Sequence, residues 1–391
     1  MSHRKLKADH LFDGNRFVQG DPVLVVNNDF SIRDIISSDE AGGDVEVYSG
    51  ILSPGFINAH CHLELSHMIG LIPAGTGLVD FVCKVVNERH LQENEIQIAI
   101  KDAEARMYAS GIVAVGDICN NLSTLIQKGK NNLSYYNFIE ASGWLPGGAP
   151  VRFERSRELY EEFRKLSRMV SIVPHAPYSV SNELWKLISP YYENQVVSIH
   201  NQEAAFEDEF FMNGSGDFLR MYQLMNIDNS FFSASKKSSL QTYFQNLGVA
   251  ASVLLVHNTF ITQDDIDYLH KNIVNQLLSF CLCINANLYI EKALPPLEIL
   301  IASGINIVLG TDSLASNKSL DMLEEMKTIQ QNFPSVSLKQ MLTWATSNGA
   351  KALLQADHLG CFGKGKKPGV VLIENTENFQ LTSISNSRRI L

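Results

Sequence analysis

The sequence predicts an α/β fold: a (β/α)8 TIM barrel with a small β-sandwich domain formed from both chain ends. Three observations support this prediction. Eight apolar runs rich in Val, Ile and Phe alternate with amphipathic stretches through the middle of the chain. Both ends of the chain contain short apolar segments separated by turn residues. Polar residues suited to metal and acid-base chemistry follow five of the eight runs, and such a barrel carries its active site at those strand ends.

The chain ends predict short strands and turns. Their apolar segments are bounded by Gly-rich or Asn-rich turns and show no long helical period. In the N-terminal part these segments are residues 7–12, 22–26, 30–36 and 45–48. After Gly360, a turn-rich cluster precedes the apolar residues 370–373 and a last alternating stretch. We predict that residues 1–52 and 361–391 form the β-sandwich domain and that residues 53–360 form the barrel.

The eight central runs predict parallel strands, because near-continuous apolar runs suit strands that are buried on both faces. The runs are residues 55–62, 112–118, 133–141, 170–177, 196–203, 253–260, 276–287 and 306–312. Amphipathic stretches that suit crossover helices are residues 96–110, 158–168, 264–271, 296–303 and 319–333. An open doubly wound sheet is the alternative. It is disfavoured because no Gly-x-Gly-x-x-Gly follows the early strands.

Composition narrows the class of protein and its partners. The 391 residues carry a formal net charge of −10, which argues against a nucleic-acid surface and favours a small-molecule substrate. No apolar run is long enough to span a membrane, and the N-terminus lacks a secretory signal, so we expect a cytoplasmic protein without a membrane partner. The six cysteines are scattered and are expected to be reduced. The sequence leaves open whether the chain forms a homodimer.

Candidate metal ligands follow three of the predicted strands. The first strand ends in His60-Cys-His62, the fifth in His200 and the eighth in Asp312. Three imidazoles and one carboxylate suit one divalent ion, with Zn²⁺ expected first and Fe²⁺ as the alternative. No lysine that could bridge two metals ends the fourth strand, so we predict a single ion. Taken singly, each histidine could instead be a hydrogen-bonded core residue.

Other polar residues at the same strand ends predict catalysis and substrate binding. Glu203 lies three residues after His200 and could move a proton between water and substrate, and His257 ends the sixth strand, where it could stabilise developing negative charge. The expected substrate contacts are His175, Glu64, Asn287 and Ser313. A core role for His175 and a capping role for Glu64 are the alternatives.

These motifs resemble the amidohydrolase superfamily and, within it, the aminohydrolase branch of metal-dependent deaminases and chlorohydrolases. The resemblance rests on residues 54–62, 175–179, 200–203, 257–258 and 309–317. It implies the barrel and β-sandwich, metal ligation by His60, His62, His200 and Asp312, catalysis by Glu203, His257 and Asp312, and substrate contact by His175. The 175–179 and 310–317 stretches also resemble the aminodeoxyfutalosine deaminases. The seventh strand departs from the pattern, because Cys283-Ile-Asn-Ala-Asn287 replaces the Cys-Pro-x-Ser-Asn of many relatives.

We therefore expect a hydrolytic deaminase that acts on an aminated purine or a nucleoside-like heterocycle, with aminodeoxyfutalosine as one candidate. In this reaction water adds to an amidine-like carbon, Glu203 protonates the ring nitrogen, and ammonia leaves. A chlorohydrolase or an amide-bond hydrolase would use the same residues with a different leaving group. A metal-stabilised binding protein without turnover is the third hypothesis. It is harder to reconcile with Glu203, His257 and Asp312 together.

Overall fold

The structure is a computed structural model that describes residues 3–391. Its centre contains eight parallel strands in two four-stranded sheets, with strand orders β10-β9-β8-β7 and β11-β12-β13-β14. The strands are β7 Phe56–Cys61, β8 Ile112–Cys119, β9 Ser134–Ala141, β10 Val170–Pro174, β11 Val196–Asn201, β12 Ser252–His257, β13 Leu277–Leu282 and β14 Asn306–Leu309. Each of the eight apolar runs of the sequence overlaps one of these strands, so this part of the prediction is confirmed.

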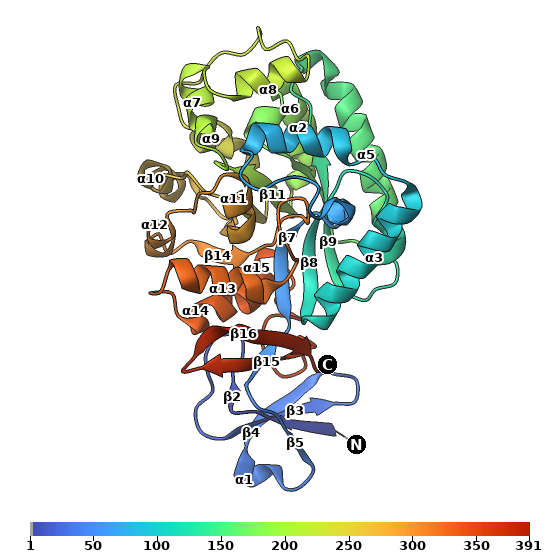
Figure 1. Cartoon of the computed structure of the whole chain (residues 1–391), viewed down its shortest axis with the longest axis vertical. Coiled ribbons are helices and arrows are strands. Elements are labelled where there is room, and N and C mark those ends of the chain that lie inside the picture. Colours follow the sequence, from blue (N-terminus) through green and yellow to red (C-terminus); the bar gives the residue numbers. More distant parts are fainter. Residues whose placement is uncertain (1–2) are drawn as a thin grey trace.

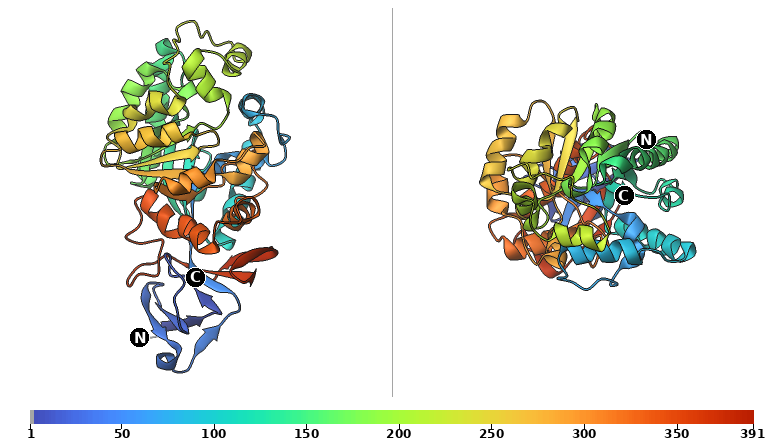
Figure 2. Two further views of the ribbon diagram at one scale, coloured as in Figure 1. Left: turned by 90° about the vertical axis from the view of Figure 1, so that its left-hand side faces the viewer. Right: turned by 90° about the horizontal axis from the view of Figure 1, so that it is seen from above.

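The two sheets meet at both junctions to give a TIM-barrel-like arrangement. Beside β7, the backbone N–H groups of Thr311 and Asp312 donate to the carbonyl oxygen of His60 at 3.0 and 3.1 Å. Gly310 permits this approach, because a Cβ there would lie 2.9 Å from the His60 Cβ. Between β10 and β11, the N–H of His200 donates to the His175 carbonyl oxygen at 3.0 Å. Seen from above, helices surround the strands (Figure 2).

The five predicted crossover helices are present as α3 Glu93–Ala109, α5 Ala149–Leu166, α10 Gln263–Asn272, α12 Leu297–Ala302 and α13 Met322–Asn332. The sequence analysis did not identify α2 Leu78–Glu88, which lies over the carboxyl ends of the strands (Figure 1). The remaining helices are α1 Ser38–Ala41, α4 Leu125–Lys128, α6 Asn182–Ile188, α7 Phe206–Asn213, α8 Phe218–Leu224, α9 Ser239–Tyr243, α11 Ile284–Ile290, α14 Leu338–Thr343 and α15 Gly349–Ala352. No helix within residues 3–391 is long and apolar enough to cross a membrane.

Several predicted strands were too long. The run 276–287 was wrong beyond Leu282, because the chain turns there and α11 begins at Ile284. Ile284, Ala286 and Ile290 of this helix are buried, and a buried helix is as apolar as a buried strand, so composition alone does not separate them. The runs 170–177, 196–203, 253–260 and 306–312 likewise extended past the observed strand ends. The strand expected at residues 7–12 is instead the end of β1 and the short β2.

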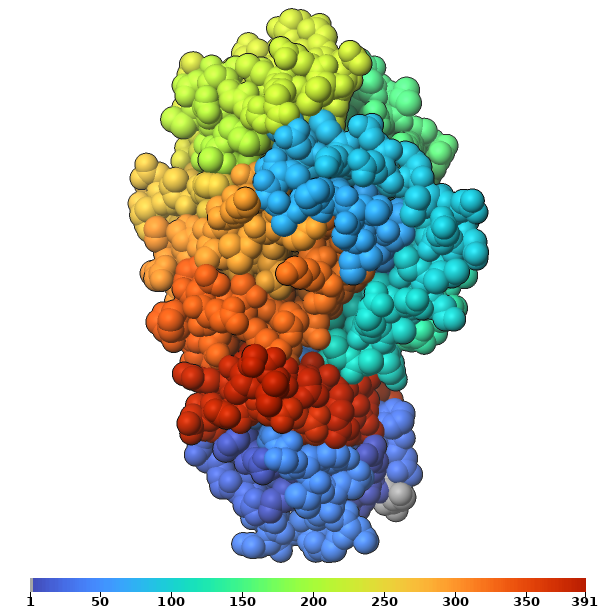
Figure 3. All heavy atoms as spheres, viewed as in Figure 1, coloured from blue at the N-terminus to red at the C-terminus, as the bar shows by residue number. Residues whose placement is uncertain are grey.

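The chain ends form two further four-stranded sheets, with orders β4-β3-β1-β5 and β16-β15-β6-β2. Their strands are β1 His3–Lys7, β2 His10–Leu11, β3 Pro22–Asn27, β4 Ile32–Ser37, β5 Val45–Val47, β6 Ile51–Pro54, β15 Val370–Glu377 and β16 Gln380–Arg389. β6 pairs antiparallel with β15, so both chain ends contribute to one sheet. Leu6, Leu24 and Leu372 share an apolar cluster between the sheets. The C-terminal strands lie between the N-terminal part and the remainder of the molecule (Figure 3).

Candidate active site

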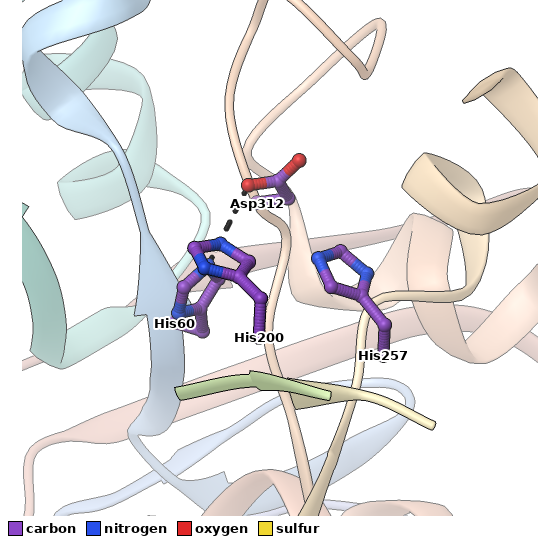
Figure 4. Close-up of side chains that lie close together, drawn as sticks. All are labelled: His60, His200, His257 and Asp312. Atoms are coloured by element: carbon purple, nitrogen blue, oxygen red, sulfur yellow. Dashed lines mark ion pairs between the residues drawn. The ribbon is translucent and has the colours of Figure 1, made fainter. Parts of the chain in front are cut away.

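A cluster of buried imidazoles and one carboxylate lies at the carboxyl ends of β7, β11, β12 and β14. One ligand atom from each of His60, His200, His257 and Asp312 lies within 4.8 Å of the others, and all four side chains converge in Figure 4. The Nε2 atoms of His60 and His62 lie 3.5 and 3.2 Å from Asp312 Oδ1. The structure therefore brings together all four ligands expected from the sequence, with His257 beside them.

The cluster fits a divalent metal ion. Within residues 3–391, neither ring nitrogen of His60 has a hydrogen-bond partner, although the side chain is completely buried. Buried polar atoms without partners are rare in proteins and indicate a missing ligand. Several neutral imidazoles and one carboxylate are the donor set that Zn²⁺ and Fe²⁺ take.

Burial keeps the imidazoles of His62, His175 and His200 uncharged near neutral pH. It lowers the pKa of His62 to about 3 and that of His175 to about 4, and it also lowers the pKa of His200. Burial alone would raise the pKa of Asp312, but the adjacent imidazoles, that of His60 first, hold it well below its usual range. Near neutral pH the cluster thus offers imidazole lone pairs and an ionised carboxylate, which is the protonation state that binds a cation.

Glu203 lies beside the cluster, on the turn after β11. Its Oε1 is 3.6 Å from His257 Nε2, and burial raises its pKa well above the usual range. Glu207 stabilises this turn, because its carboxyl group accepts hydrogen bonds from the backbone N–H groups of Gln202 and Glu203 at 3.0 and 3.3 Å. Gln202 adopts a left-handed φ of 44°, a strained conformation that non-glycine residues adopt mainly where surrounding contacts impose it.

His257 is oriented by a residue that was expected to contact substrate. Its Nδ1 lies 2.7 Å from Asn287 Oδ1. Because an amide oxygen accepts, Nδ1 carries the proton and Nε2 turns its lone pair toward the cluster. Asn287 lies on α11 and is absent from the residues that line the cavity described below. Its contact in the structure is therefore with His257.

A cavity of about 360 Å³ opens onto the cluster. His175, Glu64 and Ser313, the other expected substrate contacts, line it together with Glu203 and Asp312. His175 Nδ1 is 2.7 Å from Ser179 Oγ. Further lining residues come from α2, α5, α8 and the loops, and include Leu78, Phe81, Arg89, Trp144, Arg152, Arg155, Tyr178, Met221 and Tyr222. The segment 204–248 thus contributes Met221 and Tyr222 to the wall.

The sequence analysis missed Asn120 and Glu140, which also line the cavity. Glu140 is the penultimate residue of β9, and Asn120 directly follows β8. Both therefore occupy the strand-end positions that drew attention to the histidines. That position was the available signal, but a lone Asn or Glu is too common at strand ends to be singled out.

Comparison with known proteins agrees with this geometry. Residues 51–391 match the family described as "Amidohydrolase family". The adenosine deaminase of Helicobacter pylori is 28% identical over 316 residues, which cover 78% of this chain and 75% of that protein. The aminodeoxyfutalosine deaminase of Deinococcus radiodurans is 27% identical over 318 residues, 78% of this chain and 73% of that protein. The solved structure of Helicobacter pylori aminofutalosine deaminase with methylthio-coformycin has a TM-score of 0.80 at 22% identity, covering 97% and 93% of the two chains.

Proposed function

The chain belongs to the amidohydrolase family, and from that premise we propose that it is a metal-dependent hydrolytic deaminase of a purine nucleoside or a similar aminated heterocycle. One observation carries the proposal. The buried carboxyl group of Glu203 and the imidazole of His257 meet a cluster fit for a metal ion at a single cavity of about 360 Å³. The relatives reported above are named as deaminases, which supports the release of ammonia over other leaving groups.

We propose that His60, His62, His200 and Asp312 hold one divalent ion, with zinc first and iron(II) as the alternative. When bound, such an ion acts as a Lewis acid and lowers the pKa of water near it. His257 also lies within the cluster, but we assign it a catalytic role because its Nε2 faces Glu203. A His257→Asn variant should therefore keep its metal content, whereas His60→Asn should lose it.

The residues of the chain then divide the proton transfers. Asp312, ionised at neutral pH, accepts one proton of the attacking water and later returns it to the amino group, which leaves as ammonia when the C–N bond breaks. Glu203, held protonated by burial, donates to the ring nitrogen next to the carbon under attack, and this makes the ring a better electron acceptor. The added oxygen then becomes a carbonyl, and its remaining proton restores Glu203. His257, whose orientation Asn287 fixes, accepts a hydrogen bond from the attacking water at Nε2 and so orients it. His175, Glu64 and Ser313 are proposed to contact the substrate directly, and Asn287 to act through His257.

We propose aminodeoxyfutalosine as the first candidate substrate. Relatives with that name and the resemblance of residues 175–179 and 310–317 support it. Part of the cavity wall is basic, because Arg89, Arg152 and Arg155 line it. Guanidinium groups bind carboxylates well, so the wall favours a nucleoside with an anionic substituent over an uncharged one such as adenosine.

Some expectations go beyond what the comparisons address and are kept as proposals. We propose that the eight central strands close into a complete barrel over residues 53–360. Residues 1–52 and 361–391 would then form one β-sandwich domain. A cytoplasmic location and a homodimer without nucleic-acid or membrane partners also stay predictions.

The proposal is tested by ammonia release from the zinc-loaded protein. Aminodeoxyfutalosine, S-adenosylhomocysteine, adenosine and guanine are offered in parallel, and the Glu203→Gln variant at equal metal content is the control. We expect ammonia from at least one compound with the native protein and almost none with the variant. The alternative hydrolases would be supported if none of the four compounds released ammonia and the protein instead released chloride from a chlorinated heterocycle or a larger amine from an amide. A metal-loaded protein inert toward all of them would support the binding-protein hypothesis.

A further inference from the structure

Two buried carboxyl groups beside the cluster each have one oxygen without a hydrogen bond. Glu64 and Glu140 are 2% and 8% exposed, and both line the cavity. Within residues 3–391, Glu64 Oε1 and Glu140 Oε1 accept no hydrogen bond. A buried polar atom without a partner is unfavourable. A ligand that donates a hydrogen bond to each of these oxygens would therefore gain binding free energy.

Asn120 links the two carboxyl groups. Its backbone N–H donates to Glu64 Oε2 at 2.9 Å, and its side-chain Nδ2 donates to Glu140 Oε2 at 2.8 Å. Glu64 lies just after β7, Asn120 just after β8, and Glu140 at the end of β9, so three neighbouring strands position the pair. Asn120 therefore orients both carboxyl groups by one oxygen each and leaves the Oε1 atom of each one able to accept a hydrogen bond from a ligand.

A second cation is the other ligand that carboxyl groups suggest. Glu140, His175 and His200 do bring one ligand atom each within 4.8 Å of one another. However, His200 Nδ1 donates to the carbonyl oxygen of His175 at 2.7 Å, which leaves only its Nε2 as a ligand atom. That nitrogen is the one available to the metal site proposed above with His60 and Asp312, and Glu64 is outside the group. Donor groups of a substrate therefore match the two unpartnered oxygens better than an ion does.

On the basis of the proposed function, we propose that Glu64 and Glu140, held by Asn120, bind the two neighbouring hydroxyl groups of a ribose ring. A vicinal diol presents two O–H donors on adjacent carbons, and carboxylates bind ribose hydroxyl groups in this way in dinucleotide sites. The pair selects ribonucleosides over deoxynucleosides and over free bases. It thereby separates recognition of the sugar from the chemistry at Glu203 and Asp312.

The test compares kcat/KM for ammonia release by the native zinc-loaded protein with the fastest ribonucleoside substrate and with its 2′-deoxy and 3′-deoxy forms. Each missing hydroxyl group leaves a carboxyl oxygen unpaired, so we expect kcat/KM to fall on the order of 10- to 100-fold for each. Equal values for all three would overturn the inference. If only a free base released ammonia, this inference would be overturned, but the proposed deaminase activity would stand. No ammonia from any compound would overturn the proposed function and this inference with it.

Variants assign the effect to the carboxyl pair. In Glu140→Met, or in Glu140→Gln if the first does not fold, the preference for ribose over one of the two deoxy forms should shrink toward unity. Glu104→Gln is the matched control, because Glu104 is also buried but accepts from Gln127, Asn132 and Tyr135 and lies outside the cavity lining. An unchanged preference in the Glu140 variants would contradict the proposal. The proposal would also be contradicted if the native chain bound two metal ions and Glu140→Gln lost one of them. The carboxyl oxygens would then be ligands of a cation.

Discussion

Two groups of buried polar side chains flank the turn that carries Glu203, and they differ in how completely they are hydrogen-bonded. Behind the turn, Glu207 accepts from two backbone N–H groups and from Ser239 Oγ. Asp265 accepts from Gln202 Nε2 and Thr262 Oγ1 at 2.9 and 2.8 Å. In front, on the cavity side, neither ring nitrogen of His60 has a hydrogen-bond partner within residues 3–391.

This difference distinguishes side chains that stabilise the turn from side chains that bind ligands and take part in turnover. A buried network with all its hydrogen bonds made fixes one conformation of the backbone, here the turn that aims Glu203. A buried group with unmade bonds destabilises the protein until a ligand supplies them. Substitutions behind the turn should therefore act mainly on stability, and substitutions in front mainly on ligand binding and turnover.

The largest expected effect is on turnover, from Glu203→Gln in front of the turn. The amide cannot exchange a proton, so kcat should fall by roughly 10²- to 10⁴-fold. The midpoint of thermal unfolding should not fall, because burial already favours the uncharged acid. Steady-state kinetics and differential scanning calorimetry check both parts. Lost turnover accompanied by a strongly lowered midpoint would remove the distinction between the two groups.

Asp265→Ala should have the largest effect on stability. It leaves Thr262 N–H and Ser238 Oγ without their acceptor and removes one of the two acceptors of Gln202 Nε2. The free energy of unfolding should therefore drop by at least about 2 kcal/mol. Urea denaturation measures the change, and Asp265→Asn, which keeps one acceptor oxygen, should lose less. An unfolding free energy equal to that of the native protein would show that this network is not supporting the fold.

Glu207 links stability to pH. Burial raises its pKa from 4.5 to about 8. A carboxyl group with a raised pKa in the folded state contributes most stability below pH 4.5, and that contribution is lost as the pH rises through about 8. Denaturation between pH 5 and 8, a window set by this shift, should show stability falling by up to about 1.4 kcal/mol per pH unit from this residue. Glu207→Gln should flatten the profile, and an unchanged slope would exclude the residue as its source.

The smallest effect is expected far from both groups, in the terminal sheets. Arg4 donates to both oxygens of Glu46 at 2.7 Å, and each side chain is 41% exposed. Because exposed ion pairs contribute little, Glu46→Gln should change the unfolding free energy by less than about 1 kcal/mol and leave turnover unaffected. Urea denaturation and the ammonia assay measure the two effects. A larger change in unfolding free energy or in turnover would contradict this prediction.

Sequence reasoning predicted which residues gather in the cluster more readily than which residues support the turn behind it. His60, His62, His200 and Asp312 were found because strand ends of a barrel meet in space, so their positions along the chain already implied proximity. Asn120 joins Glu64 to Glu140 across separations of 56 and 20 residues, and nothing in their local sequence marks such a pairing. The helix α11 was mistaken for strand because it is buried and apolar, and with it the contact between Asn287 and His257 was missed.

The most direct test of the central claim is a zinc titration of metal-free protein while ammonia release from its best substrate is followed. If His60, His62, His200 and Asp312 form the single metal site of a deaminase, activity should rise linearly and level off at one zinc ion per chain. A plateau only at two ions per chain would contradict the single site. Full activity in protein verified to be free of metal would contradict the metal-dependent reaction itself.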